Sequence, residues 1–214
     1  MRLTLNFDKI RPMFGGKLRQ PQVDGINLIL RYYSGDSIPE LAYILATAKW
    51  ESAHTMQPLR EIGRGRGKKY GVVDSTGKAP YGRGLVQLTW ARNYKNADQK
   101  LGLGGRLAAD YDLALDPVIS VKILINGMRD GWFTGKKLSD YIDGTVSRVN
   151  FINARRIVNG TDRAPEIADL ALTFAGALSA TGTAAPTSAG VEVAPASGFW
   201  AALIHMIAAL FGRK

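Results

Sequence analysis

The chain has 214 residues, no cysteine and only two histidines, His54 and His205. Disulfides, thiolate metal sites and most multi-histidine zinc sites are therefore excluded, and hydrolytic chemistry has to rest mainly on carboxylates. The net charge is +10, which favours polyanionic partners such as nucleic acid, acidic lipids or an anionic bacterial envelope.

Two helices are predicted at the start of the chain. Apolar residues at helical spacing predict a short helix over 7–14, which the pair Gly15-Gly16 can end, and a second helix over 22–33. The first eight residues lack the long apolar core of a secretory signal. We therefore expect the protein to start its life in the cytoplasm.

A third helix is predicted over 38–53, and it places Glu51 in an unusual position. Ser37 and Glu40 form a capping-box pattern with a proline between them, and an apolar face follows at Leu41, Ile44, Leu45 and Ala48. This face continues to Glu51, although glutamate is rarely buried unless it is paired or functional. Desolvation and the helix dipole favour the protonated form, which a general acid needs. The alternative is a frayed helix end that exposes Glu51 to solvent.

Residues 57–80 are predicted to be irregular, because glycines are scattered among arginines and lysines there. This segment contains a second carboxylate, Glu61. Loops rich in glycine and arginine can bind nucleic acid, but the aromatic residues that single-strand binders interleave are nearly absent here. We therefore expect no nucleic acid partner.

The rest of the chain is predicted to be mostly helical. Leu85 to Leu88 alternates loosely and predicts a short strand, and Thr89 is predicted to cap a helix over 90–101. Three further helical segments are predicted: one that starts at Asp116-Pro117, one over 150–158 that ends at the Asn159-Gly160 turn, and one after Pro165.

The composition changes near the C-terminus. Residues 179–198 are rich in Ala, Thr, Ser, Gly and Pro and are predicted to be a linker. Residues 199–211 form an apolar segment of roughly 20 Å as a helix, too short to cross a bilayer that needs about 20 residues. This tail is expected to pack on the domain, to mediate self-association, or to lie in a membrane interface.

Two stretches resemble glycoside hydrolase family 19, which contains the plant class I and II chitinases, and more narrowly its phage endolysin branch. They are Tyr81-Gly82-Arg83-Gly84-Leu85-Val86-Gln87-Leu88-Thr89-Trp90, followed by Asn93-Tyr94, and Arg156-Ile157-Val158-Asn159-Gly160. The resemblance covers about 7–178 and not the tail. It implies a mainly helical, α+β lysozyme-like fold: a two-lobed catalytic domain over 1–178 with a small β-sheet beside the cleft, then the linker over 179–198 and a tail helix over 199–214.

The resemblance also implies roles for particular residues. Glu51 would be the general acid and Glu61 the general base, while Thr89 would help to hold the attacking water. The family usually has histidine just before the acid and glycine two residues after it, where this chain has Trp50 and Ala53. Substrate contacts are implied at the matching motif positions, which are Tyr81, Arg83, Gln87, Asn93 and Asn159.

The implied mechanism is a single displacement with inversion, which requires two carboxyl groups roughly 6.5–9.5 Å apart. Each supporting residue also has a structural alternative. Gln87 and Asn93 could be surface polar residues of a strand and a helix, and Arg83 could brace a loop. Asn159 could be a left-handed turn residue. No metal or organic cofactor is implied.

We expect an endolysin that hydrolyses β-1,4 glycosidic bonds of bacterial peptidoglycan for host lysis. It would reside in the host cytoplasm before lysis and then act in the periplasm on the cell wall, as a monomer whose tail contacts an anionic membrane or lipopolysaccharide. The alternatives are a chitinase that acts on N-acetylglucosamine polymers and a non-enzymatic protein that disrupts the envelope through its basic surface and apolar tail.

Overall fold

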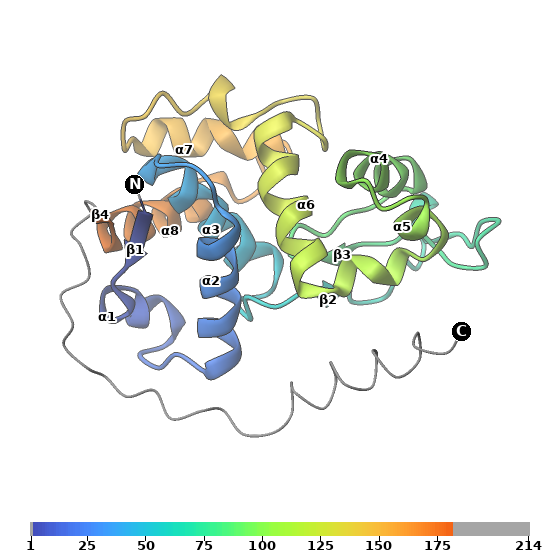
Figure 1. Ribbon diagram of the computed structural model, residues 1–214, viewed down its shortest axis with the longest axis horizontal. Coiled ribbons are helices and arrows are strands. Elements are labelled where there is room, and N and C mark those ends of the chain that lie inside the picture. Colours follow the sequence, from blue (N-terminus) through green and yellow to red (C-terminus); the bar gives the residue numbers. More distant parts are fainter. Residues whose placement is uncertain (1, 182–214) are drawn as a thin grey trace, which may run out of the picture. The chain divides into compact units, whose positions relative to one another are not determined.

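The computed structural model describes residues 2–181, which are mainly helical (Figure 1). In chain order the elements are β1 (Arg2–Leu5), α1 (Phe7–Ile10), α2 (Gln20–Tyr32), α3 (Ile38–Glu51), β2 (Leu59–Arg60), β3 (Arg83–Gly84), α4 (Ala91–Leu101), α5 (Arg106–Ala109), α6 (Pro117–Asp130), α7 (Arg148–Ala154), α8 (Ala164–Ala177) and β4 (Leu178–Thr181). Short 3-10 turns occupy Arg11–Phe14, Lys69–Gly71, Tyr111–Leu115, Leu138–Asp140 and Arg155–Ile157. The predicted tail over 199–214 and most of the predicted linker lie outside the described residues.

The helix α6 lies between two groups of elements. Figure 1 shows α1, α2, α3, α7 and α8 on one side of it and α4, α5, β2 and β3 on the other. α3 packs against α8, and α7 packs against the same helix, while α2, α3 and α4 all contact α6. This arrangement gives the two lobes that the resemblance implies.

The core of the first group is built around α3, whose residues from Leu41 to Lys49 are all buried. The side chain of Ser37 accepts a hydrogen bond from the Glu40 N–H, which confirms the predicted N-cap. Glu40 does not complete a capping box; it forms an ion pair with Arg129 instead. Because the helix is enclosed along its length, its C-terminal end at Glu51 is the part that reaches a cavity.

The small sheet in the second group consists of β2 and β3, which pair Leu59 with Gly84 and Arg60 with Arg83. The strand predicted over 85–88 is wrong. Residues 85–87 form a turn in which Gln87 has a φ of 51°, and Leu88 bridges back to Arg83. The apolar residues of this stretch are buried in the core without extended pairing.

The start of α4 also differs from the prediction. The helix begins at Ala91, and its N-cap position is Trp90, which has a φ of 69° and makes no side-chain capping bond. Thr89 is therefore not the cap, and its side chain makes no hydrogen bond within residues 2–181. The C-terminal end at Gly102 is left-handed, as expected for a glycine that stops a helix.

The ends of the described chain form a second two-stranded sheet. β1 pairs antiparallel with β4, in a register that runs from Arg2 opposite Thr181 to Leu5 opposite Leu178. The folded region thus continues three residues past the predicted boundary at 178. Ser179 was assigned to the linker by composition, but its hydroxyl hydrogen-bonds that of Thr4 at 3.1 Å.

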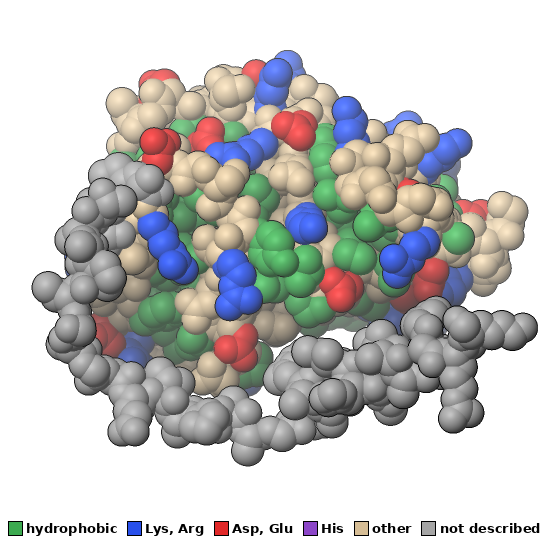
Figure 2. Space-filling view, in the orientation of Figure 1, with side chains coloured by type: hydrophobic (Ala, Val, Ile, Leu, Met, Phe, Trp, Pro, Cys, Tyr) green, Lys and Arg blue, Asp and Glu red, His purple; other side chains and the backbone are tan. Residues whose placement is uncertain are grey.

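The surface drawn in Figure 2 carries its Lys and Arg side chains scattered among other residues, with no single basic patch. Among residues 2–181, no helix is both long and apolar enough to cross a membrane.

Candidate active site

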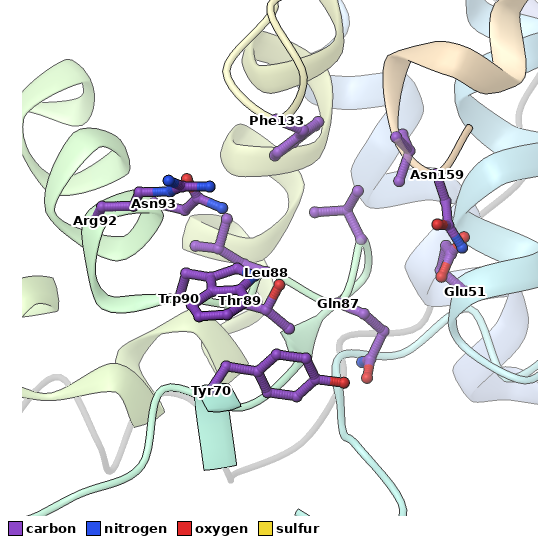
Figure 3. Close-up of a pocket in the computed structure, with 12 residues that line it drawn as sticks. Glu51, Tyr70, Gln87, Leu88, Thr89, Trp90, Arg92, Asn93, Phe133 and Asn159 are labelled. Atoms are coloured by element: carbon purple, nitrogen blue, oxygen red, sulfur yellow. The ribbon is translucent and has the colours of Figure 1, made fainter. Parts of the chain in front are cut away.

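A cavity of about 380 Å³ lies where the two groups of elements meet. Figure 3 shows Glu51 and Asn159 on one side of it and Tyr70, Trp90 and Asn93 on the other. The full lining comprises Glu51, Tyr70, Val86, Gln87, Leu88, Thr89, Trp90, Arg92, Asn93, Phe133, Val158 and Asn159. Five of the eight predicted site residues line this cavity: Glu51, Gln87, Thr89, Asn93 and Asn159.

Glu51 is the last residue of α3, and its side chain is 15% exposed. Its Oε1 accepts a hydrogen bond of 2.7 Å from Nη1 of Arg155, whose own side chain is 1% exposed. Arg155 is fixed in turn, because its Nε donates to the carbonyl oxygen of Asp162 at 2.8 Å. Glu51 is thus a paired carboxylate at the cavity wall and not a frayed helix end.

Sequence reasoning missed Arg155 as a site residue. A signal was present, because Arg155 directly precedes the second family-like stretch and a carboxylate on a buried helix face calls for a cation. The pairing joins residues 104 positions apart, so the sequence alone could not select Arg155 over the other arginines.

The chain leaves α3 through a strained turn. Ala53, His54 and Met56 have φ values of 48°, 65° and 56°, in the left-handed region that costs a non-glycine residue roughly 1–2 kcal/mol. The turn is held by Ser52, whose Oγ accepts a hydrogen bond from the Met56 N–H at 2.9 Å. A glycine, which the resembled family usually has at the position of Ala53, would adopt this conformation without strain.

Glu61 lies beside the cavity without lining it. Its Oε1 accepts a hydrogen bond from the Tyr70 hydroxyl at 3.1 Å, and its Oε2 accepts one from the Gly82 N–H at 2.9 Å. Burial and the nearby Glu61 raise the pKa of Tyr70, so this hydroxyl remains a donor at neutral pH. Because both oxygens of Glu61 accept, the arrangement fits an ionised carboxylate.

Gly82 makes room for this arrangement. A Cβ at this position would lie 2.8 Å from Oε1 of Gln87 and 3.3 Å from Oε2 of Glu61. Gln87 itself is fixed by two hydrogen bonds from its Nε2, to the carbonyl oxygens of Leu59 at 3.1 Å and Gly84 at 3.0 Å. Its Oε1 is the side-chain atom left to accept a bond from a ligand.

Each wall of the cavity carries one asparagine, Asn93 on one side and Asn159 on the other (Figure 3). Within residues 2–181, neither the Asn93 nor the Asn159 side chain hydrogen-bonds another residue. Asn159 is not the left-handed turn residue of the structural alternative, because the positive φ of 56° belongs to Gly160. Both asparagines therefore present unused amide groups to the cavity.

Tyr81 and Arg83 point into the protein and do not line the cavity. Arg83 is 2% exposed, with its Nε donating to Asp112 at 2.7 Å and its guanidinium 3.6 Å from the centre of the Tyr81 ring. Its Nη1 also donates to the carbonyl oxygens of Ala79 and Tyr81. The geometry fits the alternative in which Arg83 braces a loop. It does not fit the substrate contacts that were predicted for Tyr81 and Arg83.

Seven of the lining residues were not predicted as site residues, and four of these are aromatic or charged: Tyr70, Trp90, Arg92 and Phe133. Tyr70 and Trp90 contact each other edge to face at 5.5 Å, and the Arg92 guanidinium lies 5.9 Å from the Trp90 ring. An aromatic residue inside a glycine-rich basic segment was the available signal for Tyr70. The part of the chain that the structure describes contains no group of three or more side chains that could hold a metal ion.

Comparison with known proteins supports the fold and gives a short local match. No protein-family model matches the chain. Over 46 residues it is 50% identical to an acidic 26 kDa endochitinase of Solanum lycopersicum, and this match spans 21% of the chain and only 18% of that protein. The structure is similar to the crystal structure of chitinase C from Streptomyces griseus HUT6037, with a TM-score of 0.53 and 19% identity over 78% of this chain and 73% of that one. The predicted α-rich, lysozyme-like fold is confirmed.

Proposed function

We propose that this chain is a glycoside hydrolase of the family 19 type that cleaves β-1,4 glycosidic bonds of bacterial peptidoglycan. The observation that carries the proposal is the cavity lined by Glu51, Thr89, Asn93 and Asn159, beside the half-buried base candidate Glu61. The fold shared with a chitinase and the local identity with an endochitinase support a polymer of amino sugars as the substrate.

In the proposed mechanism Glu51 donates its proton to the glycosidic oxygen as the bond to the sugar breaks. Arg155 engages Oε1, so Oε2 is the oxygen left to carry this proton. Glu61 accepts a proton from a water that attacks the opposite face of the sugar, so the configuration inverts. The water takes the place of the Tyr70 hydroxyl at Oε1, while the Gly82 N–H keeps Oε2 oriented. Thr89 helps to hold the water.

The biological role that fits this activity is host lysis by a phage endolysin. The motif resemblance and the net charge of +10 support it, because the bacterial envelope is anionic. The protein would reside in the host cytoplasm until lysis and then reach the wall through the periplasm. Contact of the tail with an anionic membrane or lipopolysaccharide is part of the same proposal and concerns residues outside the described part.

The test compares wild type with Glu51→Gln on purified peptidoglycan from a Gram-negative bacterium. We expect wild type to clear the suspension and release new reducing sugar ends, identified by mass analysis, and Glu51→Gln to lose about 10²–10⁴-fold in rate because proton donation is lost. Equal clearing by both proteins would show that Glu51 is not the acid. Killing of permeabilised bacteria by a Glu51→Gln, Glu61→Gln double variant would favour the non-enzymatic alternative.

The second candidate is a chitinase, because both similar proteins carry that name. Hydrolysis of N-acetylglucosamine oligomers by wild type, without release of reducing ends from peptidoglycan, would favour it. The same Glu51→Gln variant serves as the control, since both reactions use the same acid.

A further inference from the structure

The segment between the two short strands contains the most concentrated group of unpaired cations in the described chain. We call residues 62–73 the basic loop. Four of its cations are exposed and form no ion pair or side-chain hydrogen bond within residues 2–181: Arg64, Arg66, Lys68 and Lys69. Some exposed cations elsewhere form ion pairs, as Arg148 does with Asp169 and Arg163 with Glu166. Exposed cations without an ion pair within residues 2–181, such as Lys17, Arg31 and Lys100, are separated along the chain. The basic loop is therefore a surface with uncompensated positive charge.

The acidic residues next to the basic loop do not neutralise it. Glu61 is held by Tyr70 and Gly82, as described above. Asp74, at the other end, accepts hydrogen bonds from the hydroxyls of Tyr111 at 2.5 Å and Thr76 at 2.7 Å. Neither carboxylate forms an ion pair with the loop.

The basic loop has a defined shape that brings its tip close to the cavity. Its two arms touch, because a Cβ on Gly71 would lie 1.8 Å from the carbonyl oxygen of Gly65. Successive turns with backbone bonds from Lys68 to Gly65 and from Gly71 to Lys68 hold the tip, 66–69. The next residue is Tyr70, whose ring lines the cavity.

A continuous strip connects this tip to the other cation at the cavity. Tyr70 contacts Trp90, and Trp90 contacts the guanidinium of Arg92, which is exposed, lines the cavity and has no ion pair within the described residues. A polymer bound along Tyr70 and Trp90 therefore meets positive charge at both ends of this wall. A neutral sugar chain would leave that charge unused.

We infer that the basic loop and Arg92 bind carboxylates that hang from the glycan strand, so that the site selects peptide-bearing peptidoglycan over a neutral polymer such as chitin. This inference rests on the proposed function. Peptide stems carry free carboxylates next to the sugars, and charge complementarity of this kind supplies specificity and faster association. A lipid surface fits less well, because the loop tip contains no apolar side chain; Ile62, Val72 and Val73, which are exposed, lie near the two ends of the loop.

The test measures binding separately from hydrolysis. The full chain carrying Glu51→Gln is sedimented with native peptidoglycan and with the same material after its carboxylates have been chemically amidated. We expect at least about tenfold tighter binding to the native material at low salt, and a smaller difference at high salt, because exposed charges are screened. Adding Arg66→Glu, Lys68→Glu and Lys69→Glu is expected to weaken binding to native peptidoglycan by about tenfold, with little change on the amidated form.

A matched control carries Lys17→Glu, Arg31→Glu and Lys100→Glu, which reverse three exposed cations away from the cavity and change the net charge equally. It should keep the preference for native material. Equal losses in the two triple variants would mean that net charge alone attracts the chain and would overturn the inference. It would also be overturned if the loop variant kept its preference for native peptidoglycan and lost binding only to vesicles of anionic phospholipid.

Failure of the proposed function gives a different result. In that case the wild-type protein releases no reducing sugar ends from native or amidated peptidoglycan, whichever of the two it binds more tightly.

Discussion

Single residues set the electrostatic character of the proposed catalytic centre. Glu51 faces a buried guanidinium on one oxygen, while Glu61 accepts hydrogen bonds on both of its oxygens. The two carboxylates are therefore held by different partners. The same region contains Lys49, which the proposed mechanism does not use.

Lys49 is a buried cation whose replacement should stabilise the protein. It is 2% exposed, its ammonium group contacts the His54 ring and the Phe14 ring, and burial lowers its pKa to about 8. Below pH 8 the lysine is charged in the folded and the unfolded chain, so folding carries the full desolvation cost. We expect Lys49→Met to raise the free energy of unfolding at pH 7 by about 3 kcal/mol, since the pKa falls from 10.5 to about 8 and each pKa unit corresponds to about 1.4 kcal/mol.

The gain in the free energy of unfolding from Lys49→Met should become smaller at high pH. Between about pH 8 and the unfolded lysine pKa near 10.4, the unfolded wild-type chain binds more protons, so wild-type stability rises with pH. Urea unfolding at pH 7, 8, 9 and 10 measures the difference between the two proteins, which cancels the titration of other groups. Lys49→Arg keeps the charge at every pH in this range. The difference in stability between Lys49→Met and Lys49→Arg should therefore stay constant with pH. A difference in the free energy of unfolding between Lys49→Met and wild type that stays constant from pH 7 to pH 10 would contradict this account.

At the scale of elements, the sequence predicted what is encoded locally. α3 follows from Ser37, a first-turn proline and apolar spacing, all within 14 residues of one another. The turn at 85–87 could not be predicted, because its apolar alternation is also what a short strand would show. β4 could not be predicted either, since Ser179 and its neighbours share the linker's composition and their partner strand is 175 residues away.

The pairing of β1 with β4 predicts where the domain can be cut. A chain that ends at Gly182 should keep the free energy of unfolding of the folded domain. A chain that ends at Ala177 should lose about 3 kcal/mol, because it loses the ladder hydrogen bonds and the burial of Leu178, which is 7% exposed. Denaturant unfolding of both chains tests this. Equal denaturation midpoints would mean that β4 does not stabilise the domain and that the domain ends at about 178, as predicted from the sequence.

At the scale of the whole molecule, the cavity is assembled from parts that are distant in sequence. Glu51 comes from α3 and Asn159 from the segment after α7, while Tyr70 and Asn93 come from the opposite group of elements (Figure 3). Motif spacing could predict that several of these residues matter, but it could not predict the pairing with Arg155 or the inward direction of Arg83. Both depend on which buried charges face each other after segments distant in sequence pack together.

Because the asparagines lie on opposite walls, a bound glycan strand should depend on both of them. In the Glu51→Gln background, Asn93→Ala and Asn159→Ala should each weaken binding of a peptidoglycan fragment by about fivefold, the loss expected for one hydrogen bond of about 1 kcal/mol. Neither should alter unfolding without ligand, since these side chains make no hydrogen bonds within residues 2–181. Asn96→Ala, one turn further along α4 and outside the cavity lining, is the matched control and should bind normally. Calorimetric titration measures all three. If only one of the two asparagines affected affinity, the glycan would rest on a single wall, and binding across the cavity would be ruled out.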